Sequence, residues 1–546
     1  MDFYDCGDVL TRRQALHRFG LAAFGTLAAP LLTAGRDASV VLAGAPPTPG
    51  GTPVRGGTLA LSLDGIPGAN ISPATSGVAE IVLGMHVYEG LVAPDPVTGA
   101  GVRPVLAESW QVSPDGRVYT FRLRRGVTFH DSTPFTAEAV ELNFRRLRDP
   151  NSRFFFKIGE AVSNIVFRLT DRVEVADDYT VRYHMRERDP DFIYLLRRPQ
   201  ALFMSPTVIK QFTPDEAGKH PVGTGPFRLT EQQEGTRYTL ERFSGYWDGA
   251  PYLERLVYRP GLDPTASVAA LLAGELDLLT EASYDTIDRL KGRFVPFEWG
   301  PEFHWTVTLN TRHPFTRDVR VRQALNYALN REAWVQGIFK GFAKPARGPA
   351  TTGYPAWNPG LRGYPYDPDR AKALLAAAGY ESGVRVKAMI PTTGVPLAQE
   401  IGQSIQADLR KVGIDLRYDA LEFNAYFSRF RQGLTEEHIF GVSWWASDFL
   451  AFLEQQLSQS RWPPNGVNRG WYHNAEADRL LTAGREESND EKRKAIYQRA
   501  ERIIVNDAPW LFTVYFRRIG LKSQKVQSIR SYASQTPDYS KTWLKR

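Results

Sequence analysis

Nine histidines are spread along the 546 residues, and few stand near a carboxylate at a spacing typical of catalytic or metal sites. His130-Asp131 follows a predicted strand, and such a pair can bind a metal or act as a catalytic dyad. A hydrogen-bonded pair at the end of the strand is the more common outcome, and we expect it here. His438 follows Glu436 and Glu437, which we interpret as solvated charges on a helix. The histidine pattern therefore does not indicate acid–base catalysis, and we predict no metal site.

A second candidate for chemistry is Gly223-Thr224-Gly225, which begins like a dinucleotide-binding fingerprint. It continues with Pro226-Phe227, so the third glycine is missing, and we predict a turn. The sequence contains no Gly-x-Ser-x-Gly elbow, no phosphate-binding Gly-x-x-x-x-Gly-Lys run and no His-Glu-x-x-His. Catalytic triads are defined by geometry and not by sequence order. The missing motifs therefore make an enzyme, such as a secreted hydrolase, less expected without excluding one, and we expect no cofactor.

The charge pattern indicates a solvated surface. The 67 basic and 60 acidic residues give a net charge of +7, and the two signs alternate, as in Glu491-Lys492-Arg493-Lys494. A nucleic-acid-binding protein would show a basic block, so we expect no nucleic-acid partner. The hydrophobic share of 42% and the charged share of 23% are those of a globular protein. The length predicts two to four domains.

Residues 1–45 are typical of an export signal. Arg12, Arg13 and Arg18 precede a weakly apolar stretch over 19–34, and Ala43-Gly44-Ala45 offers a cleavage site. The Thr11-Arg12-Arg13 run resembles a twin-arginine signal. A general secretory signal or a membrane anchor is the alternative, and cleavage after Ala34 is as well supported as cleavage after Ala43. Residues 46–55 then form a flexible lead-in.

The single cysteine, Cys6, limits two further possibilities. One cysteine can form neither an internal disulfide nor a cysteine-based zinc site. A lipoprotein needs its cysteine after the apolar stretch, whereas Cys6 precedes it. No later stretch has 18 consecutive apolar residues, the length of a membrane-spanning helix. We therefore expect a soluble protein that is released after signal cleavage.

The early part of the chain is predicted to be rich in strands. Apolar residues alternate with other residues over 57–63, 118–123 and 181–185, which predicts strands with one buried face. A helix is predicted over 78–88.

The later part alternates helices and strands. One apolar stripe predicts a helix that is capped by Thr316 or Asp318. The stripe consists of Val321, Ala324, Leu325, Ala328 and Val335. Asp367-Pro368 opens a second helix, and Gly379 ends it.

A βαβ unit is predicted near residue 400. Leu397, Ile401, Ile405 and Leu409 repeat at fourfold spacing, as on one face of a helix. This helix lies between an alternating strand over 384–390 and a strand that begins at Ile414. The order strand, helix, strand within about 35 residues predicts a parallel pair of strands.

Several runs together resemble the extracellular solute-binding proteins of family 5, the receptors of importers driven by ATP hydrolysis. Two of them are Tyr88-Glu89-Gly90-Leu91 and Gly223-Thr224-Gly225-Pro226-Phe227. The others cover 56–59, 104–110, 113–116, 119–131, 271–277, 309–310, 314–315, 318–325, 366–368 and 378–380. One such run would be weak, but this many in family order is strong.

The resemblance implies a fold of the α/β (α+β) class, similar to periplasmic binding proteins of type II. Two lobes would enclose a ligand cleft, and an extra β-rich domain would be attached. Lobe one would comprise 56–86, 206–308 and 510–546, the extra domain 87–205, and lobe two 309–509. Two chain crossings between the lobes would form a hinge, and closure would bury the ligand.

The resemblance also implies candidate ligand-binding residues. In peptide-binding members, a Trp-x-x-Asp segment places an aromatic wall and a carboxylate in the cleft, and the carboxylate pairs with the ligand's ammonium group. The matching spacing here is Trp445-Ala446-Ser447-Asp448. The chain then departs from the family pattern and is shortened, so an alternative alignment places Trp445 itself where the aspartate belongs.

Three more residues belong to the candidate site. Neighbouring strand residues point to opposite faces, so one of Trp444 and Trp445 is expected to face the cleft. Arg461 could bind a ligand carboxylate. Tyr515 follows the segment in which the chain returns to lobe one.

The resemblance thus predicts a monomeric periplasmic receptor, most of all for peptides or peptide-like solutes, that delivers its ligand to a membrane permease and its ATPase. A receptor for a chelated metal such as nickel is the alternative within the family. The identity of the ligand stays open, because members share their lobes and differ in the lining of the cleft.

Overall fold

The computed structural model describes residues 52–74, 77–95, 101–393, 395–446, 449–530 and 537–546. The chain divides between Ala45 and Pro46 into two compact units. The first unit contains the predicted export signal and lies outside the described residues, as does Cys6. The account below concerns the second unit.

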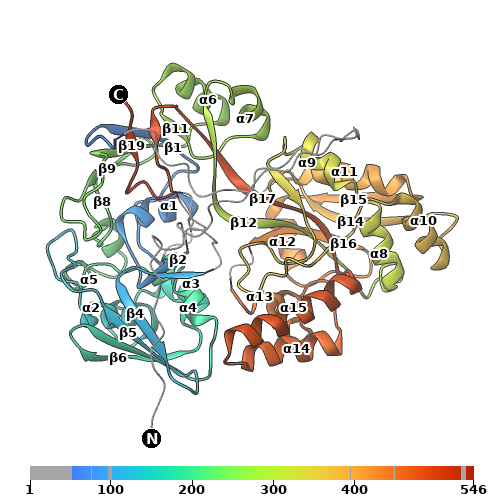
Figure 1. The fold of residues 1–546 in the computed structure, drawn as a ribbon, viewed down its shortest axis with the longest axis horizontal. Helices are drawn as coiled ribbons and strands as arrows, with labels where there is room; N and C mark the ends of the chain where they lie inside the picture. Colours follow the sequence, from blue (N-terminus) through green and yellow to red (C-terminus); the bar gives the residue numbers. More distant parts are fainter. Residues whose placement is uncertain (1–51, 75–76, 96–100, 394, 447–448, 531–536) are drawn as a thin grey trace, which may run out of the picture. The chain divides into compact units, whose positions relative to one another are not determined.

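One mixed sheet forms the centre of the described fold (Figure 1). Its strand order is β16-β12-β17-β11-β1-β10-β9-β8, and β13 pairs with β17. In chain order the strands are β1 (Thr58–Leu63), β8 (Phe227–Gln233), β9 (Arg237–Arg242), β10 (Arg255–Pro260), β11 (Leu278–Leu279), β12 (Val295–Leu309), β13 (Ala343–Pro345), β16 (Phe440–Ala446) and β17 (Trp510–Lys522). The predicted first strand is confirmed, and β1 runs parallel to β10 and β11.

Two long antiparallel strands, β12 and β17, join different parts of this sheet. Near one end, Lys522 of β17 pairs with Leu278 of β11. Further along, β17 pairs with β13, and β12 pairs with β16. The register between β12 and β17 shifts between Trp299 and Phe303. Both strands therefore take part in two packing regions, as crossings between two lobes would.

The β-rich stretch forms a separate four-stranded antiparallel sheet in the order β4-β5-β7-β6. Its strands are β4 (Ala107–Val112), β5 (Val118–Leu123), β6 (Thr170–Asp177) and β7 (Thr180–Met185). Tyr119, Phe121 and Leu123 are buried, as their alternation predicts. Helices α2 (Ala137–Arg148) and α3 (Lys157–Phe167) accompany the sheet, and a small hairpin, β2 (Val92–Pro94) and β3 (Val102–Pro104), precedes it.

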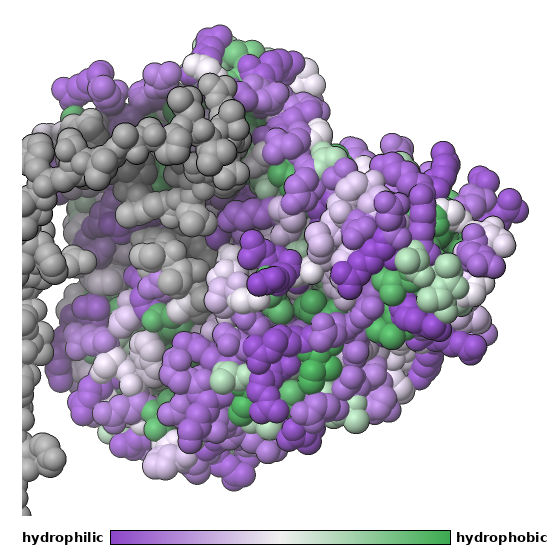
Figure 2. Space-filling view, turned by 45° about the vertical axis from the view of Figure 1, so that its right-hand side comes forward, coloured by the Kyte–Doolittle hydropathy of each residue, from purple (hydrophilic) through white to green (hydrophobic). Residues whose placement is uncertain are grey.

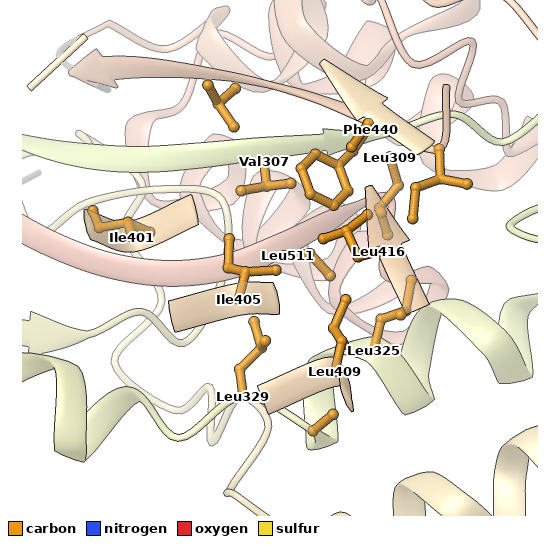
Figure 3. Packing of buried hydrophobic residues seen from close by; sticks show 14 of the residues in the cluster. Val307, Leu309, Leu325, Leu329, Ile401, Ile405, Leu409, Leu416, Phe440 and Leu511 are labelled. Atoms are coloured by element: carbon orange, nitrogen blue, oxygen red, sulfur yellow. The ribbon is translucent and has the colours of Figure 1, made fainter. Parts of the chain in front are cut away.

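The predicted βαβ unit near residue 400 is confirmed. Strands β14 (Val384–Pro391) and β15 (Ile414–Leu421) pair in parallel, and α11 (Ala398–Arg410) connects them. Ile401, Ile405 and Leu409 point from α11 toward Leu416, Phe440 and Leu511 in the apolar core (Figure 3). Leu397 precedes the helix with a φ of 56°, so the helix begins one residue later than its apolar stripe.

The helix predicted from Val321 to Val335 is in fact two helices. Helix α8 (Val319–Tyr327) begins after Asp318, whose carboxylate caps it, and α9 (Arg331–Gly337) begins after Asn330, whose side chain caps it. Asn330 supplies a new N-cap, so the stripe continues across a break. The predicted helix after Asp367 is confirmed as α10 (Pro368–Ala377), and Gly379 follows it with a φ of 89°.

The remaining elements surround these sheets. The helices are α1 (Val78–Val87), α4 (Phe192–Leu195), α5 (Pro206–Gln211), α6 (Pro264–Ala273), α7 (Tyr284–Leu290), α12 (Phe423–Phe430), α13 (Phe452–Leu457), α14 (Ala475–Glu486) and α15 (Asp490–Asp507). Strands β18 (Val526–Gln527) and β19 (Trp543–Leu544) form a short pair. Glu436 and Glu437 lie in a turn before β16, so their prediction as helix charges is wrong.

Buried apolar residues form separate clusters. One includes Phe121 and Tyr183 of the four-stranded sheet, another Leu61 and Leu256 of the central sheet, and a third surrounds α11. The boundaries that we predict for the lobes and the extra domain stay predictions, because residues 46–546 form one compact unit.

The surface carries mixed charge, as the composition predicts. In Figure 2, hydrophobic residues of the visible face occur in patches between hydrophilic ones. Opposite charges pair at that kind of surface, for example Arg385 with Asp415 at 2.8 Å and Lys494 with Glu491 at 2.9 Å. Among the described residues, every helix is too short or too polar to cross a bilayer.

Candidate ligand site

The first candidate pocket lies where β1 and β11 end. The Thr280 N–H donates to Ser62 Oγ at 3.0 Å and joins the two strand ends. Asp64 follows β1, and Glu281 follows Thr280. Because the two strands are parallel, their carboxyl ends meet at one edge of the sheet. That edge therefore brings two acidic side chains to one pocket.

Trp299 and Arg518 complete this pocket from the two long strands, on which they are register partners. Trp299 Nε1 donates to the Thr280 carbonyl at 2.6 Å, and the Arg518 guanidinium lies 5.1 Å from the Trp299 ring centroid, within cation–π range. An aromatic ring, a guanidinium and two carboxylates thus surround one space. These groups can recognise a ligand that carries both an ammonium and a carboxylate group.

The electrostatics of this pocket depend on burial. Crowding by protein atoms raises the pKa of Glu281, while Arg518 lowers it and Asp64 raises it. Much of the Glu281 side chain still contacts solvent, which screens these effects. A cationic group of a ligand would offset the repulsion between the two carboxylates.

A second pocket adjoins the first, and Pro537 lines both. Its wall includes Glu89, Arg103, Arg197 and Tyr246, and it holds about 650 Å³ of space that is open to solvent. A ligand that reached from one pocket into the other would meet acidic and basic side chains in both.

A polar network supports the second pocket. Glu89 accepts hydrogen bonds from Tyr246 Oη at 2.8 Å, Trp247 Nε1 at 2.9 Å and Thr224 Oγ1 at 3.0 Å. Burial raises the pKa of Glu89 to about 7 although these donors lower it. The chain bends at 224–226, directly before β8, as a change of direction at this motif predicts. The glycine motif therefore supports the wall of the second pocket through Thr224.

Tyr515 lies on β17 and is almost completely buried. Its hydroxyl donates to the Gly348 carbonyl at 2.8 Å and accepts from the Gly348 N–H at 3.1 Å. The Arg347 N–H reaches the same oxygen at 3.3 Å. The hydroxyl is thus occupied by the 347–348 backbone, and a contact between Tyr515 and ligand stays a prediction.

Arg461 ends a short 3-10 turn after α13 and forms an ion pair with Glu454 at 2.7 Å. Arg485 contacts the same carboxylate at 3.4 Å. Glu454 is buried, so the Arg461 guanidinium neutralises an internal charge here. To bind a ligand carboxylate it would have to leave Glu454, and its ligand role stays a prediction.

The predicted aromatic wall lies at the end of β16. Trp444 is opposite Trp305 of β12, and Trp445 is opposite His304. Asp448, the predicted partner of the ligand's ammonium group, lies outside the described residues. The roles of these three residues therefore stay predictions.

The two residues of the His130-Asp131 motif bind different partners. His130 Nε2 contacts the Gly225 carbonyl at 2.9 Å, and Asp131 accepts from Ser205 Oγ at 2.6 Å. Each residue thus anchors this segment to another part of the chain, His130 to Gly225 and Asp131 to Ser205. The predicted hydrogen bond between His130 and Asp131 is wrong. Burial lowers the pKa of His130 to about 4, so it is neutral at neutral pH.

Four residues of the first pocket are absent from our sequence predictions. Asp64 directly follows an alternating strand, and that position could have marked it. Glu281, Trp299 and Arg518 carry no local signal of this kind. They meet because β11, β12 and β17 pair over long sequence separations.

Comparison with known proteins decides the family. Residues 101–464 match the family model of bacterial extracellular solute-binding proteins, family 5 Middle. The chain belongs to this family. The chain is 31% identical to the glutathione-binding protein GsiB of Pectobacterium atrosepticum over 431 residues. That match covers 77% of this chain and 82% of the relative.

Solved structures of family 5 type agree with this fold. The periplasmic binding protein DppA of Helicobacter pylori, in complex with the peptide STSA, is 27% identical with a TM-score of 0.69. HbpA2 of Haemophilus parasuis is 26% identical with a TM-score of 0.79. Each match covers 90% of this chain, with 99% of the first structure and 100% of the second. The predicted mixed α/β fold of a periplasmic binding protein is confirmed.

Proposed function

We propose that this family 5 protein is the receptor of an ATP-driven importer and binds a short peptide with free termini, of the size of glutathione. The observation that carries the proposal is the first pocket. Asp64 and Glu281 can bind an ammonium group there, Arg518 can bind a carboxylate, and Trp299 offers an apolar face. The relatives support the ligand class, since one is named for glutathione and another was solved with a tetrapeptide.

The adjoining pocket supports a ligand of more than one residue. Arg103 and Arg197 lie in its wall with Glu89 and Tyr246. A second carboxylate of a ligand would approach the guanidinium groups of that wall. A ligand that contacts both pockets would favour a closed state over an open one.

Calorimetric titration of the mature protein tests this function. We expect reduced glutathione or a di- to tetrapeptide to bind, and N-acetylation of the peptide to weaken binding by about tenfold or more, because the ammonium loses its charge-assisted hydrogen bonds. Nickel–histidine, added in a parallel titration, tests the alternative ligand within the family. Mass spectrometry of the recovered ligand tests the hydrolase alternative, since turnover would contradict a receptor.

Two substitutions locate the termini of the ligand. Arg518→Ala is expected to weaken peptide binding by about 10- to 100-fold through loss of a carboxylate partner. Asp448→Ala tests the other ammonium partner, the one that the family resemblance implies: it should weaken binding and remove the effect of N-acetylation only where Asp448, and not Asp64 with Glu281, pairs with the ammonium group. Arg237→Ala is the control, because Arg237 pairs with Glu231 in the β8–β9 hairpin. Unchanged affinity in Asp448→Ala would refute the ammonium role.

We also propose that the twin-arginine segment exports the protein to the periplasm in its folded form. Replacement of Arg12-Arg13 by two lysines keeps the charge and changes the motif, so we expect the precursor to accumulate in the cytoplasm. Arg18→Lys is the control and should be exported normally. Immunoblots of cell fractions provide the measurement. Normal export of the double-lysine variant would favour the general secretory route.

A further inference from the structure

A group of metal-ligand side chains lies in the βαβ region, on elements other than those of the two pockets. Asp419 is on β15, and Glu437 and His438 are in the turn before β16. The Ile439 N–H donates to the Lys387 carbonyl of β14 at 2.8 Å, which holds this turn against the β14–β15 pair. Strand pairing therefore positions the three side chains on a rigid support.

The geometry of the three side chains is compact. His438 Nε2 lies 2.7 Å from Asp419 Oδ2, and one ligand atom of each of the three residues lies within 4.8 Å of the others. His438 is 3% exposed, whereas 34% of the Asp419 side chain and 59% of the Glu437 side chain are exposed. An imidazole is thus fixed at the base, and two carboxylates stand toward solvent, from which an ion can enter.

A cation already contacts this group. Lys387 Nζ lies 3.2 Å from Glu437 Oε1. Half of the Lys387 side chain is exposed on a flexible stem, so its ammonium can move into solvent at small cost. The arrangement is therefore built to hold positive charge.

We propose that Asp419, Glu437 and His438 form a binding site for a divalent transition-metal ion of the Zn²⁺ class. One imidazole nitrogen and two carboxylate oxygens form a common zinc ligand set, and solvent can complete the tetrahedron. The imidazole disfavours Ca²⁺ and Mg²⁺, which prefer oxygen ligands. Binding would replace the His438–Asp419 hydrogen bond by two metal–ligand bonds and displace the Lys387 ammonium.

This inference goes beyond the receptor function and is independent of it. His438 precedes β16, whereas Trp444 and Trp445 lie at the other end of that strand. An ion at the proposed site therefore needs no contact with a peptide in the pockets of Asp64 and Glu89.

Titration of untagged, chelator-treated protein with ZnCl2 tests the site. We expect wild type to bind one Zn²⁺ per chain, Glu437→Gln to bind about tenfold more weakly, and Lys387→Met to bind about fivefold more tightly because a competing positive charge is removed. A general disturbance of the fold would weaken Zn²⁺ binding in both variants, so weaker binding in Glu437→Gln and tighter binding in Lys387→Met would be specific to the site. Glu491→Gln is the matched control, since Glu491 pairs with Lys494 on a helix surface.

The outcomes separate the proposals. Glu437→Gln should bind peptide like wild type, so a failure of the metal site leaves the receptor function in place. The metal proposal is overturned if neither wild type nor Lys387→Met binds Zn²⁺, or if Glu437→Gln binds it as tightly as wild type.

Discussion

Arg331→Met is expected to lower the free energy of unfolding by about 4 kcal/mol. Arg331 is 2% exposed, and its guanidinium donates to the carbonyls of Asn326 at 2.9 Å, Tyr364 at 3.1 Å and Leu329 at 3.3 Å. It also binds the carbonyl of Phe512 on β17. Methionine fills a similar volume but leaves these buried acceptors without their donor, and each loss is expensive in a dry interior. Urea unfolding followed by tryptophan fluorescence measures the change.

The predicted loss of stability in Arg331→Met rests on the lost hydrogen bonds, and Arg331 is charged in the folded protein. Burial lowers the pKa of Arg331 only to about 10, so the group is protonated at neutral pH. Arg331→Lys keeps the charge but loses the planar fork, and its stability should fall between those of wild type and Arg331→Met. Arg479→Met is the control, because Arg479 forms an exposed pair with Glu476 and should change stability by about 0.5 kcal/mol or less. Equal effects in Arg331→Met and the control would contradict this role.

Gly223→Ala is expected to cost about 3 kcal/mol or more, the upper end of the effect of overpacking. A Cβ at this position would lie 2.1 Å from the Val87 carbonyl oxygen and 2.7 Å from the Tyr88 ring. The backbone has little room to move away, because the Gly225 N–H donates to the same Val87 oxygen at 2.9 Å. The bend would have to separate from the end of α1, and Glu89 follows that helix by two residues.

The same unfolding assay and the peptide titration measure this effect. We expect Gly223→Ala to lose peptide affinity together with stability, since Thr224 and Glu89 support the second pocket. Gly292→Ala is the control, because a Cβ there would meet no atom within 4 Å. A stable Gly223→Ala protein with wild-type unfolding would show that the bend can shift, and the packing argument would fail.

Patterns of neighbouring residues predicted the strands and helices that have one buried face or a side-chain cap. The alternation of Leu59, Leu61 and Leu63 comes from one buried face of β1, and the fourfold spacing of Ile401 and Ile405 from one buried face of α11. Caps were visible for the same reason, as at Asp318. The stripe that ends at Val335 misled because apolar spacing continues across a new N-cap. Glu436 and Glu437 misled because charge alone does not distinguish a helix surface from a turn.

The candidate site also contains residues that a local motif predicts and residues that only strand pairing brings together. A motif such as Trp445-Ala446-Ser447-Asp448 lies within four residues and can be read along the chain, although its role here stays a prediction. The Asp64–Glu281–Arg518 pocket brings together residues more than 200 positions apart, and pairing of β1, β11 and β17 places them side by side. No spacing along the chain encodes that meeting.

The sequence by itself was enough to recognise a family 5 receptor, because the family runs lie within short segments of the chain. The export segment stays a prediction. It also predicted the strands and helices that bury one face, such as β1 and α11, because burial of one face imposes a period on the residues. Only the tertiary structure decided where charges meet. Glu281 and Arg518 line one pocket because strands distant in the sequence pair there, whereas Arg461 contacts Glu454 and His438 contacts Asp419 because neighbouring elements pack together.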